Sequence, residues 1–408
     1  MEGVIQKPAT KERENYLFCA MAVVLCVRHI LQLLGFSQIA SVLFAGLYIL
    51  TAAFSFSCLW RKLYAKQTRG EMVCFLLGLC GFVYLSGMLF LKYSAYLQQS
   101  AVFLLTLPIL IGADRVTMSE YNAKLYFRLV TVLGILLSIL VFVPSGYKKG
   151  LLLLYSANAN QSGLLYMSVF LGVYMYHCLY KKHWALYLVL AGLLYGCYRT
   201  GSRTCILACI LLIVLSFFID RKQNRNKRWL MFAMVLFVAL PFLSATLVEW
   251  LGADFKIMGE SAWTGREQMW PEIIEKIARS PLTFKIDDII VNRYGEGLGA
   301  HNAWLSVAWD YSVPVAALFL LLLYRMGCSF GVNKKNAANG VVVACFISGL
   351  LHMSFEAALI CGALDYSLYF LLPLFAGAAI VKKRECSEIE KDALNQCDCS
   401  DIQNGTVS

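Results

Sequence analysis

The chain is a succession of apolar segments, each close in length to a helix that crosses a lipid bilayer. Such a helix needs about 20 predominantly apolar residues. Lipid offers the backbone no hydrogen-bond partners, so segments of this kind fold as helices. We therefore predict an all-α polytopic membrane protein. Its expected twelve transmembrane helices lie at about 16–34, 39–60, 72–91, 99–112, 129–143, 162–180, 185–198, 204–218, 229–243, 304–324, 340–360 and 366–381.

Composition agrees with a membrane protein. Only 15% of the residues are charged and the mean hydropathy is +0.64, whereas a soluble globular chain carries about 25% charged residues. The net charge of +11 does not indicate a nucleic-acid partner, because Lys and Arg lie between the apolar segments. Most of the 15 cysteines fall inside those segments. We expect them to pack as small apolar side chains without a disulfide framework.

The distribution of positive charge predicts the orientation. Most of the 36 Lys and Arg residues fall in alternate connections, beginning with the N-terminal one. Cytoplasmic loops carry this excess, so both termini are predicted to be cytoplasmic. The first apolar segment lacks a cleavage site after it and is predicted to be a retained span. We expect an integral membrane domain at 1–384 and a polar, disordered cytoplasmic tail at 385–408.

One connection is much longer than the others. Residues 244–303 form an outer loop of about sixty residues between the ninth and tenth segments, and loops of this length are usually functional or disordered. Thr264 and Glu267 have the spacing of a helix capping box. Apolar residues then repeat at helical spacing, which predicts an amphipathic helix along the membrane or over the bundle; they are Trp270, Ile273, Ile274 and Ile277.

Three arginines are placed on this outer face. Arg199 and Arg203 are four residues apart around Gly201 and Ser202, which permit a tight turn between two short spans. They are either ligand-binding groups or hairpin-tip arginines that reach the interface. Arg266 falls in the first turn of the loop helix, where a cation opposes the helix dipole. Its position favours an anionic ligand, with a solvated arginine as the alternative.

The stretch GAHNAWLSVAWDYSVP at 299–314 adds polar groups at the entry to the tenth segment. His301 can act as a general base near neutral pH, although a hydrogen-bonded structural histidine is the alternative. Asn302 lies beside it. Asp310 lies deeper and is expected to bond within the bundle. No pair of the five histidines has ligand spacing near an outer carboxylate, so no metal is expected.

The predicted topology brings these groups to one membrane face. Three arginines and a histidine there suit an anionic lipid headgroup with chemistry beside it. Arginine matches phosphate oxygens bidentately, so a pyrophosphate is the expected ligand.

Several motifs together resemble the O-antigen ligases and O-antigen polymerases. TGSRT at 200–204 resembles the family's TGSRG-type segment. GREQMWPEIIEKIARSPL at 265–282 resembles its R-x3-W segment with the following helix, and HNAWLSVAWDY at 301–311 its HN-x2-L-x4-E/D-Y segment. SANANQSG at 156–163 resembles a weaker Asn-rich stretch. The chain departs from the family in having Ser312 where a glycine is usual and TFKIDD where a Gly-rich turn is usual.

The resemblance implies a GT-C-like helical bundle and a membrane glycosyltransferase. Such an enzyme transfers or polymerises glycan from an undecaprenyl-diphosphate-linked donor, for cell-surface polysaccharide or lipopolysaccharide, at the bacterial plasma membrane. His301 would orient or deprotonate the acceptor hydroxyl. Arg203 and Arg266 would bind the diphosphate with support from Arg199, and no metal or cofactor is implied. Further supporting residues would be Ser202, Trp270, Asn302 and Asp310.

Two other classes remain open. A transporter or lipid-linked oligosaccharide flippase is compatible with twelve spans, but such proteins more often show internal repeats and interrupted spans near the midplane. A structural membrane scaffold would not need charged groups gathered on one face. Within the favoured class, the motifs do not separate ligase from polymerase.

Overall fold

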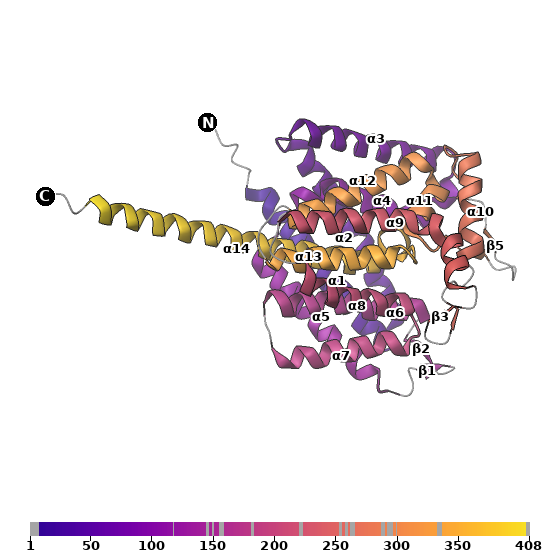
Figure 1. The fold of residues 1–408 in the computed structure, drawn as a ribbon, viewed down its shortest axis with the longest axis horizontal. Coiled ribbons are helices and arrows are strands. Elements are labelled where there is room, and N and C mark those ends of the chain that lie inside the picture. Colours follow the sequence, from indigo (N-terminus) through magenta and orange to yellow (C-terminus); the bar gives the residue numbers. More distant parts are fainter. Residues whose placement is uncertain are drawn as a thin grey trace.

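The described part of the chain is built mainly of α-helices (Figure 1). The computed structural model describes residues 8–116, 118–143, 147–148, 151–154, 159–180, 183–219, 223–252, 255–257, 260–261, 266–286, 290–291, 297–298, 300–332 and 337–404. Its α-helices are α1 (Pro8–Leu33), α2 (Ser37–Tyr64), α3 (Arg69–Leu91), α4 (Leu97–Gly112), α5 (Glu120–Leu140), α6 (Ala159–Leu179), α7 (Trp184–Arg199), α8 (Arg203–Phe218), α9 (Gln223–Leu251), α10 (Arg266–Arg279), α11 (Ala303–Tyr311), α12 (Val313–Gly327), α13 (Ala337–Met353) and α14 (Leu364–Asn404).

Short elements complete the described structure. Four are single 3-10 or π-type turns: η1 (Ser94–Tyr96), η2 (Ala113–Arg115), η4 (Cys328–Val332) and η5 (Ala358–Gly362). Six two-residue strands pair as three antiparallel hairpins: β1 (Tyr147–Lys148) with β2 (Leu151–Leu152), β3 (Lys256–Ile257) with β4 (Glu260–Ser261), and β5 (Ile290–Val291) with β6 (Gly297–Leu298). The predicted all-helical membrane class is therefore confirmed for the bulk of the described chain.

Nine described helical segments are long and apolar enough to cross a membrane. The expected count of twelve is not confirmed, because three further apolar helices are shorter. These are Trp184–Arg199, Arg203–Phe218 and Gly340–Met353. A 16-residue helix is about 24 Å long, against a hydrocarbon core of about 30 Å. The short pair α7 and α8 therefore brings its connecting turn, which carries the paired arginines, closer to the membrane interior than a long hairpin would.

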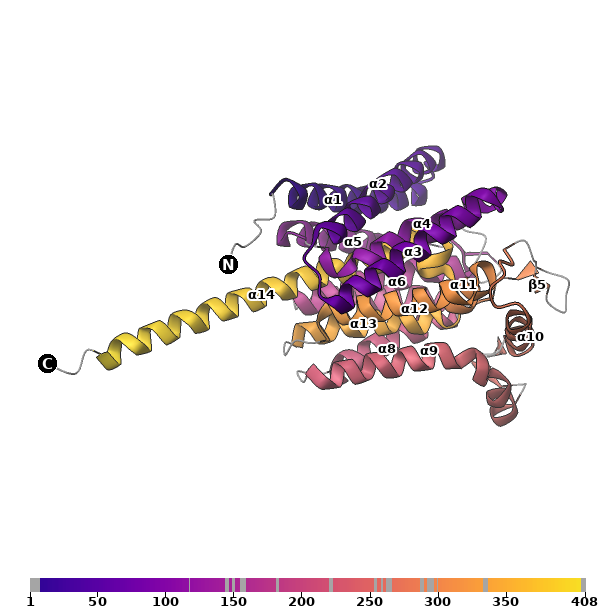
Figure 2. The ribbon, with the colours of Figure 1, turned by 90° about the horizontal axis from the view of Figure 1, so that it is seen from above.

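Two helices form the centre of the bundle. The apolar windows of α6 and α14 are each 89% buried inside the protein, whereas that of α3 is only 22% buried. A surrounding helix with so much exposed apolar surface is suited to lipid. Figure 2 shows α6 and α14 between the α1–α2 side and the α8–α9 side of the molecule. The central helices therefore hold the core, and the outer ones provide its lipid-facing wall.

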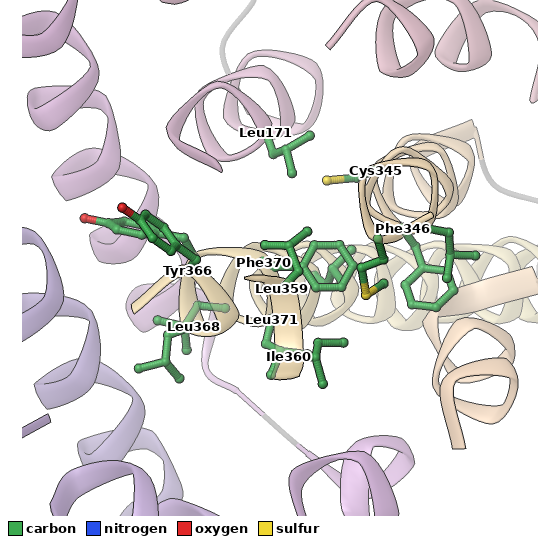
Figure 3. Packing of buried hydrophobic residues seen from close by; sticks show 14 of the residues in the cluster. Leu171, Cys345, Phe346, Leu359, Ile360, Tyr366, Leu368, Phe370 and Leu371 are labelled. Atoms are coloured by element: carbon green, nitrogen blue, oxygen red, sulfur yellow. The ribbon is translucent and has the colours of Figure 1, made fainter. Parts of the chain in front are cut away.

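Buried apolar side chains pack together where α6, α13, α14 and η5 meet (Figure 3). Phe370 of α14 stacks on Phe346 of α13 with ring centroids 6.1 Å apart. Gly349 makes this approach possible, since a Cβ there would lie 2.0 Å from the Phe370 ring. Leu359 and Ile360 of η5 are fully buried in the same cluster. This packing fixes the segment between α13 and α14, which carries part of the candidate site.

Two of the predicted spans are interrupted. The span expected at 304–324 is split into α11 and α12 at Ser312, whose φ is +94°. In the span expected at 340–360, α13 ends at Met353, and Leu359 and Ile360 of the following element η5 have non-helical backbone angles. The freed backbone groups of Ile360 are bonded to side chains: its N–H donates to Ser367 Oγ and its carbonyl accepts from Thr106 Oγ1. Irregular backbone inside a membrane protein requires such partners.

The start of α1 and the far end of α14 extend from the same end of the bundle in Figure 1, and α10 lies at the opposite end. This arrangement agrees with two termini on one side and a functional loop on the other. The helix α14 continues through Asn404, which differs from the disordered tail expected for 385–408. Residues 385–404 contain Glu, Lys, Ala and Leu and lack Gly and Pro, so they can extend a helix nucleated in the membrane.

Candidate active site

Three separate segments meet at the carboxylate of Glu356. This residue lies in the short connection between α13 and η5. His301 precedes α11, and its Nδ1 is 3.1 Å from Glu356 Oε2. Arg266 begins α10, and its Nη2 donates to Glu356 Oε1 at 3.2 Å and to the carbonyl of Phe355 at 3.0 Å. Two residues predicted for chemistry are thus joined by a third that the motif analysis did not name.

The three side chains are partly shielded from solvent. The side chains of Arg266 and Glu356 are 13% and 15% exposed, and that of His301 is 28% exposed. Burial acts to raise the pKa of Glu356, but the hydrogen bond and charge of His301 and the charge of Arg266 outweigh it, so the pKa lies below its ordinary value. Glu356 is therefore a carboxylate at neutral pH. Because an ionised carboxylate only accepts, His301 Nδ1 carries a proton, and in the neutral imidazole Nε2 is then the proton acceptor.

The backbone before α11 holds His301 in place. Its φ of +48° lies in the left-handed region, which few non-glycine residues adopt. Asn302 is the N-cap of α11: its Oδ1 accepts from the backbone N–H of Leu305, and its Nδ2 donates to the carbonyl of Ser354 at 3.0 Å. Asn302 is fully buried. It therefore ties the start of α11 to the segment that carries Glu356 and fixes the relative position of histidine and carboxylate.

The amphipathic loop helix predicted from the sequence is present as α10. Its apolar face is buried through Met269, Trp270 and Ile273, while Glu272 and Glu275 are exposed on the other face. Trp270 Nε1 donates to the carbonyl of Ala300 at 2.7 Å. This hydrogen bond of Trp270 connects α10 to Ala300, the residue before His301. Thr264 and the side chain of Glu267, the expected capping box, lie outside the described residues.

The α7–α8 turn is attached to this site through α6. A Cβ at Gly163 would lie 2.4 Å from Ser202 Cβ, so glycine is needed for this close approach. Ser202 is buried and donates to Cys205 Sγ. One turn before Gly163, Asn160 Nδ2 donates to Glu356 Oε1 at 3.4 Å. The Asn-rich stretch that resembled a family motif therefore contacts the shared carboxylate.

The paired arginines take different positions around this turn. Arg199 ends α7 and donates from Nη1 to Tyr195 Oη at 2.9 Å, with its guanidinium over the same ring. Arg203 begins α8 and is half-buried. The described hydrogen bonds join Arg266 and His301 through Glu356, whereas Arg199 and Arg203 belong to the candidate site by their place in the fold.

Asp310 lies in the last turn of α11. Its half-buried side chain forms no hydrogen bond or ion pair with the described residues, although a bond within the bundle was expected. The physical reason is that α11 stops at Tyr311, so Asp310 lies in the last turn of a short helix and not inside a long span. The next residue, Tyr311, is buried, and its hydroxyl donates a hydrogen bond to Ser100 Oγ at 2.9 Å.

Glu356 is a candidate site residue that none of the motifs contains. It lies 55 residues after His301, in a different predicted span and outside every motif. The available signal was an acidic residue inside an apolar segment, which is by default a functional candidate. Among the residues that the structure describes, no group of three or more His, Cys, Asp and Glu is arranged to hold a metal ion.

The fold and the site define a multi-pass α-helical membrane protein with an arginine–carboxylate–histidine group at one end of its bundle. Residues 186–320 match the family model described as O-antigen ligase. This match, to part of the chain, confirms the resemblance carried by the motifs. It spans every predicted site residue from Arg199 to Asp310. No curated protein and no solved structure gave a significant match.

Proposed function

We propose that this protein is a membrane glycosyltransferase that moves glycan from an undecaprenyl-diphosphate-linked donor to an acceptor hydroxyl at the outer face of the bacterial plasma membrane. The observation that carries the proposal is the joining of His301 and Arg266 through Glu356. His301 and Arg266 lie within the region that matches the O-antigen ligase model, and Glu356 lies after it. Arginine provides a phosphate-binding group, and the histidine beside it provides a base.

The reaction requires two contributions from these residues. His301 Nε2 accepts the proton of the acceptor hydroxyl while its Nδ1–H remains bonded to Glu356. The acceptor oxygen bonds to the anomeric carbon of the donor, and the bond from that carbon to the diphosphate oxygen breaks. Arg266 and Arg203 stabilise the charge that develops on the leaving diphosphate, with Arg199 in support. The donor lipid reaches the site from the surrounding bilayer, and the acceptor is a second glycan or a lipid.

Alanine substitution of the arginines tests the diphosphate assignment. In purified protein, Arg203→Ala and Arg266→Ala are each expected to lower turnover of a lipid-diphosphate glycan by about 100-fold, the usual loss for one group that stabilises developing charge. Arg279→Ala is a matched control, because Arg279 lies on the exposed face of α10 with its side chain 74% exposed. Wild-type turnover in both test variants, at normal protein levels, would rule out the assignment.

A second candidate function is transport of a lipid-linked oligosaccharide. It is favoured by a buried charged cluster in which Arg28 Nη1 donates to Asp365 Oδ2 at 2.6 Å and His29 lies 3.5 Å from the same oxygen. Ionisable groups inside membrane spans often mark transport pathways. Liposomes containing the purified protein and a fluorescent lipid-linked glycan discriminate the two functions. Movement of the lipid between leaflets, lost in Asp365→Asn and kept in His301→Ala, would favour the transporter.

A further inference from the structure

The two carboxylate oxygens of Glu356 contact two different residues of the candidate site. Oε2 faces His301 Nδ1 at 3.1 Å, and Oε1 accepts from Arg266 Nη2 at 3.2 Å. One negative charge is therefore shared between the proposed base and a proposed diphosphate-binding group. We propose that Glu356 is a positioning residue that couples diphosphate binding at Arg266 to activation of His301, an inference that rests on the proposed glycosyltransferase function.

A diphosphate competes with Glu356 for Arg266. It carries more negative charge than one carboxylate, and its oxygens match the bidentate geometry of the guanidinium. The Arg266–Glu356 pair is only 13% and 15% exposed, so solvent and salt screen it weakly. When Arg266 turns to the diphosphate, it neutralises Glu356 less. The negative charge of the carboxylate then stabilises the protonated imidazole of His301 more strongly. The imidazole is therefore a more effective base when the donor is in place.

The surrounding contacts keep Glu356 and His301 together while Arg266 changes partner. Asn302 Nδ2 donates to the Ser354 carbonyl, two residues before Glu356, and Asn302 directly follows His301. Asn160 Nδ2 donates to the same Glu356 oxygen that Arg266 uses. Neither contact involves Arg266. The histidine–carboxylate pair is therefore held by its own connections. The bonds that have to exchange are those of Arg266, to Glu356 Oε1 and to the carbonyl of Phe355.

The proton balance of the coupled step is simple. The acceptor hydroxyl gives its proton to His301 Nε2, and the electron pair of the broken sugar–oxygen bond leaves with the diphosphate. The resulting imidazolium lies against the Glu356 carboxylate, which stabilises it. Before the donor binds, the same carboxylate is partly neutralised by Arg266. The base is thus strongest only after the leaving group has been bound.

The test separates binding from turnover in Glu356→Gln, which keeps the side-chain shape and removes the charge. Farnesyl diphosphate serves as the binding probe, with purified full-length protein in lipid nanodiscs at fixed ionic strength. The variant is expected to bind farnesyl diphosphate about 3- to 10-fold more tightly, because a competing charge near Arg266 has been removed. Its kcat is expected to fall about 100-fold or more, since His301 loses the group that orients it. The KM for donor should fall with it.

Three further variants make the result specific. His301→Ala is expected to lose turnover while binding farnesyl diphosphate as the wild type does. Glu356→Asp keeps the charge and is expected to restore wild-type affinity for the probe with part of the turnover. Glu272→Gln removes a charge from the exposed face of α10, where the side chain is 51% exposed, and should change neither quantity.

Opposed changes in affinity and turnover support the coupling, whereas parallel loss of both in Glu356→Gln would show a merely structural residue and overturn it. Unchanged or weaker probe binding in Glu356→Gln would also overturn it. If Glu356→Gln does not fold, Glu356→Asp carries the test, and a probe affinity that differs from that of the wild type contradicts the proposal, because the charge that competes for Arg266 is kept. Failure of the proposed function is distinguishable, because the wild type would then transfer no glycan to any acceptor while the probe-binding comparison still reports on Glu356 and Arg266.

Discussion

Ser312 occupies a backbone position that suits glycine. Its φ is +94° and ψ is 159°, a region that side chains with a Cβ rarely adopt. Its buried hydroxyl has no hydrogen-bond partner among the residues that the structure describes. The family resemblance had placed a glycine here, and the backbone angle supplies the physical reason. Serine is retained at the junction of α11 and α12 at a cost of about 1–3 kcal/mol.

Ser312→Gly is therefore expected to stabilise the protein by about 1 kcal/mol. The substitution relieves the backbone strain of the folded state, and the greater conformational entropy of glycine in the unfolded chain offsets part of that gain. Ser306→Gly is the matched control, because Ser306 lies within the regular helix α11, where glycine costs about 0.5–1 kcal/mol. Thermal unfolding in detergent measures both. A lower melting temperature for Ser312→Gly would contradict the strain argument.

The ionised state of Glu356 predicts a pH dependence of stability. Arg266, His301 and His352 act together to hold its pKa below the ordinary value of 4.5, against the opposing effect of burial. A carboxyl group with a lowered folded pKa stabilises the protein fully above its unfolded pKa, and the contribution is lost as the pH falls through the folded pKa. Between pH 7 and pH 5 the pair with Arg266 should therefore be intact.

Glu356→Gln is expected to lower the melting temperature at pH 7 and to reduce the loss of stability that the wild type shows below pH 4.5. Thermal unfolding from pH 7 to pH 3.5 measures the difference between the two proteins, so other titrating groups cancel. If the melting temperatures of the wild type and the variant change in parallel over this pH range, protonation of Glu356 is not coupled to unfolding.

At the scale of elements, α10 depends on one aromatic anchor. Trp270 is 2% exposed, and its indole N–H donates to the carbonyl of Ala300 directly before His301. Trp270→Phe keeps most of the packing but leaves that buried carbonyl without its partner, which costs about 1–3 kcal/mol. We expect faster limited proteolysis of the outer loop and reduced glycan transfer. Unchanged proteolysis and transfer would show that the bond does not position His301.

The first and last spans are joined by a buried ion pair. The side chains of Arg28 in α1 and Asp365 in α14 are 11% and 8% exposed. Removing one partner leaves an uncompensated charge, so Asp365→Asn is expected to destabilise the protein by about 3 kcal/mol or more. The double variant Arg28→Leu and Asp365→Leu should recover much of this loss. A double variant less stable than Asp365→Asn would contradict the interpretation.

The positions of most helices could be predicted from the sequence, because the length and apolarity of a segment are local properties. The interruptions could not. Ser312 carries no strong turn signal. The break at Ile360 lies in an apolar run, and its non-helical backbone bonds to Thr106, 254 residues away in α4, and to Ser367 in the following helix α14. Helix ends inside a membrane bundle are therefore decided by tertiary partners that the local pattern does not contain.

At the scale of the whole molecule, the candidate site combines what the sequence could and could not provide. Arg266 and His301 were predictable because their motifs have fixed spacing and fall on one membrane face. Glu356 was not, since its contacts depend on how the connection after α13 lies against the starts of α10 and α11. Asp310 shows the converse: a polar residue in an apolar segment was expected to be bonded, but the early end of α11 leaves it without a described partner.

The central claim is that His301 is the base in a glycan transfer at this site. The most direct measurement combines purified protein, a lipid-diphosphate oligosaccharide donor and a panel of glycan and lipid acceptors, with products resolved by gel and mass spectrometry. Wild-type protein is expected to transfer glycan, and His301→Ala to lose the activity by about 100-fold or more at equal protein level. A ladder of repeat units would identify a polymerase, and a single transfer a ligase. Equal transfer by His301→Ala, or none by the wild type, would contradict the account.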